Sequence, residues 1–451
     1  MSSTTTTFPS KPQFRNKLVS SLNDIFVFVG GAILALLLLW SFCSFVSPNT
    51  MTFNISSQTR PKPTKSVEPT NSETTPPMNC AQNEPAHDPP DHTFYDDPTL
   101  TYTIDQKPIK NWDQKRQHWL AHHPSLAQPD RILLITGSQP GPCKSPVGDH
   151  LLLRFFKNKV DYCRIHGHDI FYNNALLHPK MTTFWAKLPA VRSAMVAHPE
   201  AEWIWWVDSD AAFTDMDFKI PLSRYANHNL IVHGWPNLVY EERSWVSLNA
   251  GVFLIRNSQW AMEFIHAWAG MGPQTPNYSH WSKTQKATLP DKLYPEADDQ
   301  SGLIYLLLEE NQKWADKIYL EHEFYFEGYW KEIVGSLRNV SDKYLEMERR
   351  SSSGGSGLRR RRAEKVSEYY GGVREKEFGV GGLRRPFVTH FTGCEPCSGH
   401  HNEIYSGESC LEGMQSVLNF ADDQVLRSFG FGRSDLRDSS SVAPLPFDYP
   451  A

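Results

Sequence analysis

A run of 22 uncharged residues near the start of the chain constrains its topology more than any other feature. Residues 25–46 read IFVFVGGAILALLLLWSFCSFV. At about 1.5 Å per residue, a helix of this length spans the roughly 30 Å hydrocarbon core of a bilayer. A cleavable signal peptide has a shorter apolar stretch followed by a small-residue cleavage site, and neither is evident here. The sequence therefore predicts a membrane-spanning signal anchor.

The charges on either side of this run predict its orientation. Lys11, Arg15 and Lys17 precede it, whereas the first charge after it is Arg60. Positive charges favour the cytosolic side of a membrane. We therefore expect residues 1–24 to form a cytosolic tail and the rest of the chain to be lumenal, which is a single-pass type II topology.

Composition divides the lumenal part. Residues 47–91 are rich in Pro, Ser and Thr and contain few apolar residues, so they cannot bury enough surface to offset the entropy of ordering, and a disordered stem is expected. Residues 92–451 have the composition of a folded catalytic domain. Within that domain, 347–385 are rich in Gly and Ser and include the arginine run 359–362. A flexible, solvated loop insertion is the favoured interpretation there, with a polyanion-binding patch as the alternative.

A lumenal location is oxidising, so the cysteines outside the apolar run are disulfide candidates. Cys394 and Cys397 also form a CxxC pair, which is half of a zinc site, but the sequence holds no second pair. A bridge within the carboxyl-terminal segment, or from that segment to Cys143, is the expected alternative. Three glycosylation sequons, at Asn54, Asn277 and Asn339, are compatible with the same compartment.

Apolar runs and helical stripes alternate along the first half of the folded part. Strands are expected at 131–135, 168–172 and 203–207, and helices at 147–166 and 185–198. This order is typical of an α/β domain with an open, mostly parallel, Rossmann-like sheet, in which ligands bind beyond the carboxyl ends of the strands. A further apolar run at 250–255 and an amphipathic helix at 301–309 follow in the second half.

Two aspartates follow directly on the strand predicted at 203–207. Asp208 and Asp210 are separated by one residue, a spacing at which short carboxylates can share one cation. A second pair, Asp215 and Asp217, has the same spacing but no strand before it. Position therefore favours the first pair as the cation site, with a strand-end cap or turn as the structural alternative.

A third ligand would complete such a site. Carboxylates suit Mg²⁺ or Mn²⁺, and an added imidazole favours Mn²⁺. His390 is the best candidate because it follows a short apolar stretch and precedes Gly393, which could approach a diphosphate closely. The formal net charge of −5 gives no electrostatic case for a nucleic-acid partner.

Seven ordered segments together resemble the motif series of glycosyltransferase family 34. That family contains plant xyloglucan α-1,6-xylosyltransferases and galactomannan α-1,6-galactosyltransferases, and the resemblance covers roughly residues 95–431. The segments are TGSQP at 136–140, WAKLP at 185–189, WIWWVDSD at 203–210, HGW at 233–235, LNAG at 248–251, EADDQS at 296–301 and THFTGC at 389–394.

The resemblance implies a GT-A fold, a UDP-sugar donor, Mn²⁺ and transfer with retention of configuration. It implies metal ligation by Asp208, Asp210 and His390. The implied nucleotide and diphosphate contacts are Thr136, Gly137, Ser138, Lys187, Asp208, Ser209, Asp210 and Gly393. The implied contacts to donor sugar or acceptor are Trp235, Asn249 and Gly251.

Asp298, Asp299 and Gln300 match the family's segment beside the donor sugar and are the candidate catalytic residues. A retaining transfer could use a covalent intermediate or a front-face attack assisted by the departing phosphate. Gln300 would be a poor nucleophile, so the front-face route is the favoured hypothesis. Where the xylosyltransferases carry a lysine suited to the diphosphate, this chain has Glu395.

Ala250, Val252 and the stretch 233–240 are more similar to the galactosyltransferase branch. We therefore expect transfer of galactose from UDP-galactose in α-1,6 linkage to a β-1,4-mannan or glucomannan backbone, at the Golgi membrane. A xyloglucan xylosyltransferase that uses UDP-xylose is the alternative, and a non-catalytic Golgi scaffold, suggested by Glu395, is a third possibility. A mannan synthase and a second copy of the chain are further candidate partners.

Overall fold

A computed structural model describes residues 100, 103–104, 108–350, 370, 372 and 384–445, without the side chains of 348–350. All of them belong to one unit, Ala81–Ala451. The predicted cytosolic tail, the signal anchor at 25–46 and the stem at 47–91 lie outside the described residues, as does most of 347–385. Among the residues that are described, no helix has the length and apolar character needed to cross a membrane.

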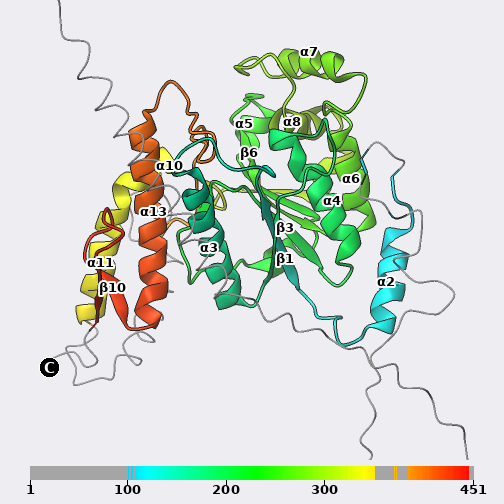
Figure 1. Ribbon diagram of the computed structural model, residues 1–451. Helices are drawn as coiled ribbons and strands as arrows, with labels where there is room; N and C mark the ends of the chain where they lie inside the picture. The colour runs from blue at the N-terminus through cyan, green and yellow to red at the C-terminus, as the bar shows by residue number, and fades with distance from the viewer. Residues whose placement is uncertain are drawn as a thin grey trace, which may run out of the picture. The chain divides into compact units, whose positions relative to one another are not determined.

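A six-stranded sheet forms the centre of the unit, with strand order β2-β1-β3-β6-β5-β7 (Figure 1). A small second sheet has the order β4-β9-β8, and β10 pairs with β11. The strands are β1 (Ile132–Gly137), β2 (Asp169–Asn173), β3 (Trp203–Val207), β4 (Ala211–Phe213), β5 (Leu230–Gly234), β6 (Leu248–Arg256), β7 (Ile318–Glu321), β8 (Gly328–Tyr329), β9 (Val388–His390), β10 (Phe431–Arg433) and β11 (Val442–Pro444).

The central sheet is mixed, because β6 is antiparallel to both of its neighbours, β3 and β5. The other pairs, β1 with β2, β1 with β3 and β5 with β7, are parallel. The α/β class and the strand–helix alternation of the first half are confirmed, but the reversed strand was not predicted. The helix between β5 and β6 has five residues, whereas a parallel crossover usually contains a longer helix that packs on the sheet.

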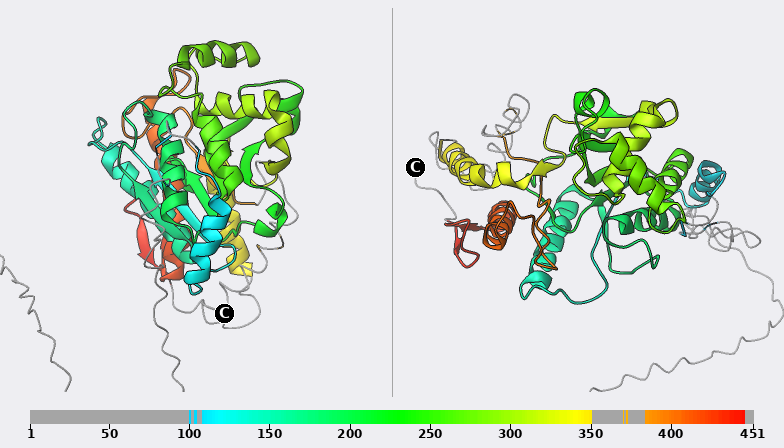
Figure 2. Two further views of the ribbon diagram at one scale, coloured as in Figure 1. Left: turned by 90° about the vertical axis from the view of Figure 1, so that its right-hand side faces the viewer. Right: turned by 90° about the horizontal axis from the view of Figure 1, so that it is seen from above.

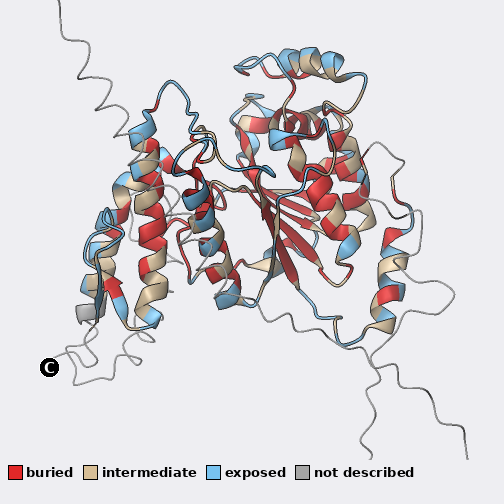
Figure 3. Ribbon diagram, in the orientation of Figure 1, coloured by how far each residue is buried: buried red, intermediate tan, exposed pale blue. Residues whose placement is uncertain are grey.

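Helices cover both faces of the sheet, and its strands are mostly buried except for the edge strand β2 (Figure 3). The α-helices are α2 (Trp112–His122), α3 (Gly148–His166), α4 (Lys187–Ala197), α5 (Pro236–Tyr240), α6 (Gln259–Ala269), α7 (Tyr278–Thr288), α8 (Asp299–Glu309), α9 (Asn311–Trp314), α10 (Trp330–Ile333), α11 (Leu337–Arg350) and α13 (Gly407–Ser428). The 3₁₀ helices in the described part of the chain are η2 (Thr183–Ala186), η3 (Leu222–Tyr225), η4 (Ala315–Lys317) and η5 (Val334–Ser336).

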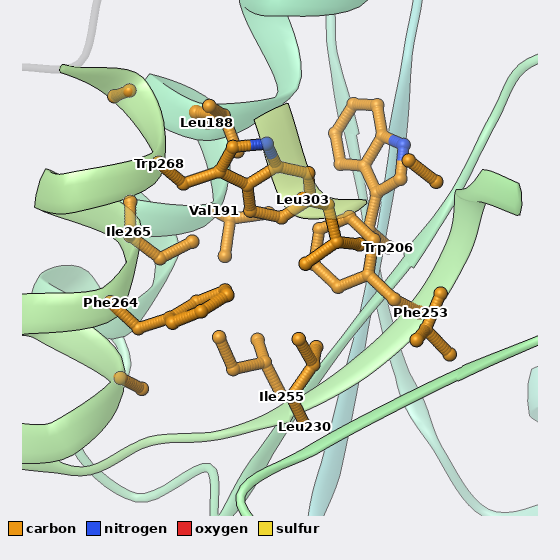
Figure 4. Close-up of a cluster of buried hydrophobic side chains, with 14 of the residues drawn as sticks. Leu188, Val191, Trp206, Leu230, Phe253, Ile255, Phe264, Ile265, Trp268 and Leu303 are labelled. Atoms are coloured by element: carbon orange, nitrogen blue, oxygen red, sulfur yellow. The ribbon is translucent and has the colours of Figure 1, made fainter. Parts of the chain in front are cut away.

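One face of the sheet packs against α4, α6 and α8. Large apolar side chains from these three helices meet side chains of β3, β5 and β6 (Figure 4). Each such side chain contributes about 1.5–3 kcal/mol when it is fully buried. This core fixes the positions of α4 and α8, the two helices whose amino-terminal residues reach the candidate site.

The other face packs against α3, and α3 in turn contacts α13 (Figure 2). Tyr162 of α3 stacks on Phe213 of β4 with ring centroids 3.8 Å apart, and Trp205 of β3 meets Phe213 edge-on. These contacts hold β4 in place, and β4 belongs to the small sheet. Because β9 pairs with β4, it lies directly beside the turn that follows β3.

The segment after β9 takes part in two disulfides, one within itself and one to the first half of the unit. Cys394 pairs with Cys410, within the carboxyl-terminal segment, and Cys397 pairs with Cys143. Both expected bridging patterns are thus present. The zinc interpretation of the CxxC pair is wrong, because each of its cysteines is engaged in a different disulfide.

Two described residues of the expected solvated loop at 347–385, one inside it and one at its carboxyl end, are packed rather than solvated. Tyr370 and Arg385 are buried. The Arg385 guanidinium lies 3.1 Å from a carboxylate oxygen of Asp217 and 3.8 Å from the ring centroid of Tyr344. The hydroxyl of Tyr370 donates to Asp215. The second Asp-x-Asp pair therefore anchors this segment, and the interpretation of the whole stretch as solvated is wrong at these positions.

We expect removal of the Cys143–Cys397 bridge by a double serine substitution to lower the free energy of unfolding by about 2–5 kcal/mol, because this bridge closes a loop of 254 residues. Thermal unfolding under non-reducing conditions measures the change. Cys163→Ala is the matched control, since Cys163 is a buried free cysteine. Equal melting temperatures for the double variant and the wild type would contradict this assignment.

Candidate active site

A tight turn after β3 carries the Asp-Ser-Asp motif. The Asp208 backbone N–H donates to the carbonyl of Gly251 at 2.9 Å, and the Ala211 N–H donates back to the Asp208 carbonyl at 3.1 Å. The Trp206 indole N–H donates to Asp208 Oδ1 at 2.6 Å. These bonds hold the turn at the carboxyl end of β3, where ligands of α/β sheets gather.

His390 reaches the same point from β9, which pairs with β4 so that Ala211 lies opposite His390. His390 Nε2 lies 3.3 Å from Asp210 Oδ1 and 3.8 Å from Asp208 Oδ2. One ligand atom from each of the three residues falls within 4.8 Å of the others. The structure thus brings together the three residues predicted as metal ligands.

Gly251 forms the back of this cluster. A Cβ at Gly251 would lie 2.4 Å from Cε1 of His390 and 2.7 Å from Oδ2 of Asp208, closer than real Cβ contacts allow. Only glycine therefore permits the imidazole and the carboxylate to converge here. Two carboxylates and one imidazole form a donor set that fits Mn²⁺.

Glu327 holds the imidazole from behind. It is buried, and its Oε1 lies 3.1 Å from His390 Nδ1, which donates the hydrogen bond. A carboxylate on Nδ1 fixes the tautomer that leaves Nε2 free for a cation and orients the ring. Glu327 immediately precedes β8, which pairs with β9, so local strand pairing places it there.

Lys187 and Asp299 flank the cluster on the side of Asp208. Lys187 is the first residue of α4 and is buried; its Nζ lies 2.8 Å from Asp299 Oδ2, 3.4 Å from Asp208 Oδ1 and 3.0 Å from the Ala250 carbonyl. Burial opposes its charge, but Asp208 and Asp299 outweigh burial and raise the pKa of Lys187. The structure thus places Lys187 beside the Asp-Ser-Asp turn, and its contact with the nucleotide donor stays a prediction.

A second buried lysine supports the turn from α3. Lys159 Nζ donates to the carbonyl of Ala211 at 2.6 Å and lies 3.4 Å from the carbonyl of Ser209. These two carbonyls flank Asp210, so Lys159 fixes the backbone on both sides of it. Burial lowers the pKa of Lys159 to about 7, and attraction to Asp210 and Asp208 only partly offsets this effect.

Four carboxylates, at 208, 210, 299 and 327, face two ammonium groups and one imidazole. For Asp210, burial alone would raise the pKa, but His390 outweighs burial and the pKa is lowered. For His390, burial opposes the charge, yet Asp210 and Glu327 raise the pKa well above its ordinary value. Burial raises the pKa of Asp299 to about 6 despite Lys187. This excess of negative charge attracts a cation, which would displace the proton from His390 Nε2.

The TGS segment lies at the same edge of the sheet as the Asp-Ser-Asp turn, because β1 and β3 are adjacent and parallel. Thr136 is buried, and its hydroxyl has no hydrogen-bond partner among the described residues. A Cβ at Gly137 would lie 2.2 Å from the carbonyl oxygen of Asn173, so glycine is required where β1 meets β2. The Ser138 hydroxyl lies 2.6 Å from that of Tyr172.

The three residues predicted as catalytic have different surroundings. Asp298 is the amino-terminal cap of α8, accepts from the Ser301 N–H at 2.6 Å and pairs with Lys292. Asp299 is the buried partner of Lys187. Gln300 bridges two backbone groups, the Ala250 N–H at 3.4 Å and the Trp245 carbonyl at 2.9 Å. Their direct role in catalysis stays a prediction.

The residues expected near the sugar or the diphosphate have different surroundings, and their contacts with a ligand stay predictions. The Asn249 carboxamide accepts from the Gly251 N–H at 2.7 Å, and Trp235 is exposed at the end of β5. Gly393 has φ +80° and packs against Asn402. The side chain of Glu395, which replaces the expected lysine, is exposed and accepts a hydrogen bond from Ser398 at 2.5 Å.

Sequence reasoning missed Glu327 and Lys159. Lys159 lies in α3 and Glu327 directly precedes β8, and contacts between segments far apart in the sequence bring both to the Asp-Ser-Asp motif. A single charged residue does not by itself indicate that it supports a distant site. The contact between α3 and β4 places Lys159, and the pairing of β8 with β9 places Glu327. For Lys159 the sequence does offer one signal, because this lysine falls on the same helical face as the apolar residues Phe155 and Tyr162.

The chain is similar to known glycosyltransferases. Residues 128–401 match the model of the "galactosyl transferase GMA12/MNN10 family". The chain is 55% identical over 448 residues to "Galactomannan galactosyltransferase 1" of Cyamopsis tetragonoloba, covering 97% of this chain and 98% of that protein. It is 53% identical to "Glycosyltransferase 6" of Arabidopsis thaliana, with 95% and 96% covered.

A third relative of Arabidopsis thaliana is "Probable xyloglucan 6-xylosyltransferase 3", which is 44% identical over 355 residues, 78% of this chain and 70% of that protein. Among solved structures, a galactosyltransferase in complex with donor and acceptor sugar analogues matches at 10% identity, covering 63% of this chain and 95% of that one. Its TM-score of 0.29 is too low to establish a shared fold.

Asp208→Asn and Asp210→Asn should each weaken Mn²⁺ binding by roughly 100-fold or more, because each removes a charged ligand. Isothermal titration with Mn²⁺ measures this loss. Asp217→Asn is the matched control: it changes an aspartate of identical spacing that pairs with Arg385 instead. If all three variants bound Mn²⁺ equally well, the cation site would have to lie elsewhere.

Glu327→Gln should lower Mn²⁺ affinity by about 10–100-fold while leaving all three ligands in place, because it weakens the orientation of His390. The same titration applies. Glu241→Gln changes an exposed carboxylate at the end of α5 and should leave affinity unaltered. An unchanged affinity for Glu327→Gln would show that the His390–Glu327 contact does not support the site.

Proposed function

Because the chain belongs to the galactosyl transferase GMA12/MNN10 family, we propose that it transfers galactose from UDP-galactose in α-1,6 linkage to a β-1,4-mannan or glucomannan backbone. The convergence of Asp208, Asp210 and His390 at the carboxyl end of β3 carries this proposal. The similarity to a galactomannan galactosyltransferase over nearly the full length of both chains supports the choice of donor and acceptor.

The three ligands would hold Mn²⁺. A divalent cation bound there supplies charge stabilisation to the departing diphosphate. The chain's own contribution is position and charge. Asp208 and Asp210 are fixed by backbone bonds, the His390 ring is oriented by Glu327, and the ammonium of Lys187 adds positive charge beside Asp208. The buried surroundings strengthen each of these electrostatic interactions.

The surroundings of the 298–300 segment support a front-face route. A covalent intermediate requires a nucleophile free to attack the anomeric carbon. Asp298 is held as a helix cap, the Asp299 carboxylate pairs with Lys187, and Gln300 carries an amide engaged with the backbone. The departing phosphate would therefore accept the proton of the attacking acceptor hydroxyl, and the configuration of the galactose would be retained.

We propose further that the enzyme works in the Golgi lumen, within a GT-A type fold and anchored by residues 25–46. The uncharged run and the charges around it support this topology. The two disulfides are consistent with an oxidising compartment. A mannan synthase in the same membrane is a candidate partner, because it would supply the backbone.

Xyloglucan xylosylation is the second candidate, because a relative at 44% identity bears that name. An assay that combines UDP-galactose or UDP-xylose with manno- or cello-oligosaccharides distinguishes the two activities. The full-length protein in detergent, supplied with Mn²⁺, should transfer galactose from UDP-galactose to manno-oligosaccharides and show little transfer of xylose to cello-oligosaccharides. Product linkage and anomeric configuration are read by NMR.

In the same assay, chelation with EDTA should abolish transfer and added Mn²⁺ should restore it. Xylose transfer to cello-oligosaccharides as the dominant reaction would overturn the choice of donor and acceptor. UDP and Mn²⁺ binding without any transfer would instead indicate a scaffold.

A further inference from the structure

A cavity of about 570 Å³ adjoins the metal centre on the side of His390, within the range of about 300–1,000 Å³ typical of ligand sites. Its lining includes Trp235 from the end of β5 together with Tyr325, Tyr329, Glu323, Glu327 and Glu332 from the segment around β8. Glu327 belongs to both sites, because it lines the cavity and also accepts the hydrogen bond from His390. A molecule in this cavity would therefore lie one side chain away from the reacting centre.

The aromatic side chains give the cavity surfaces that suit a sugar ring. Trp235 is 39% exposed, and its indole meets the His233 ring at 77° with centroids 4.6 Å apart. Tyr325 and Tyr329 are half-buried. Amphipathic rings of this kind pack against the apolar C–H face of a pyranose and offer polar atoms to its hydroxyls.

The charges of the lining are negative but do not form a metal site. Glu323 pairs with Arg224 at 2.7 Å, and Glu327 pairs with His390. Glu332 is exposed, and no ion pair to it is observed among the described residues. The group of acidic and histidine residues that could hold a cation in the described part of the chain is the one at Asp208. Glu332 therefore presents a negative charge to whatever enters the cavity.

We propose that this cavity binds the uncharged sugar units next to the one that receives galactose, with Trp235 as the stacking surface. The carboxylate of Glu332 accepts hydrogen bonds from sugar hydroxyls and repels polysaccharides that carry acidic sugars. This inference rests on the proposed function and adds to it the location of the acceptor chain and a basis for rejecting anionic acceptors.

Trp235→Ala tests the stacking surface. Binding of mannohexaose to the full-length protein in detergent, with Mn²⁺ and UDP present, should weaken about tenfold, and Trp235→Phe should recover most of the affinity. Tyr240→Ala is the matched control, because Tyr240 is similarly exposed, at 40%, on the adjoining helix but does not line the cavity. Equal affinities for Trp235→Ala and Tyr240→Ala would overturn the proposal.

Glu332→Gln tests the rejection of charge. Mannohexaose oxidised at C6 to carry carboxylates should bind this variant severalfold more tightly than the wild type, whereas plain mannohexaose should bind both similarly. Glu241→Gln removes an exposed charge outside the cavity and should change neither affinity. If the oxidised oligosaccharide bound Glu332→Gln no more tightly than the wild type, Glu332 would have no part in rejecting anionic acceptors.

The binding measurement also separates this inference from the proposed function. Mannohexaose binding that depends on Trp235, without any galactose transfer, would support the cavity and contradict the galactosyltransferase activity. Galactose transfer with an acceptor affinity that is indifferent to Trp235 would support the activity and contradict the cavity. UDP affinity in the presence of Mn²⁺ reports whether each variant retains its donor site.

Discussion

The close approach of β6 to the Asp-Ser-Asp turn at Gly251 is the contact on which the candidate site depends. The Gly251 carbonyl accepts from the Asp208 N–H, and the missing side chain leaves room for the His390 ring on one side and the Asp208 carboxylate on the other. Any larger residue would push apart these two candidate ligands, which come from segments remote in sequence. The reversed direction of β6 is what presents this glycine to the turn.

The sequence indicated the residues of the site better than it indicated their support. Asp208 and Asp210 could be found because they follow an apolar strand, and His390 and Lys187 because they occur in recognisable motifs. The direction of β6 could not be found, since it depends on a pairing between strands whose local patterns fit either direction. Glu327 was missed for a related reason. It contacts His390 only because β8 pairs with β9, and this pairing is not evident from the sequence.

The burial of charged residues was also harder to predict from the sequence than the burial of apolar ones. A run rich in Gly, Ser and Arg predicted a solvated loop, yet Arg385 at its end is buried against Tyr344 and the carboxylate of Asp217. Lys159 and Lys187 are likewise buried, each beside groups that compensate its charge. Composition records how many charges a segment has, whereas burial depends on partners supplied by other segments.

The order of the ligands along the chain has a consequence for biosynthesis. Asp210 precedes His390 by 180 residues, which ribosomes add in roughly 10–35 s at about 5–20 residues per second. During that interval the emerging polypeptide carries both carboxylates together with Lys159 and Lys187, but not yet the imidazole of His390. A cation that needs all three residues would therefore bind only after β9 has been made and paired with β4.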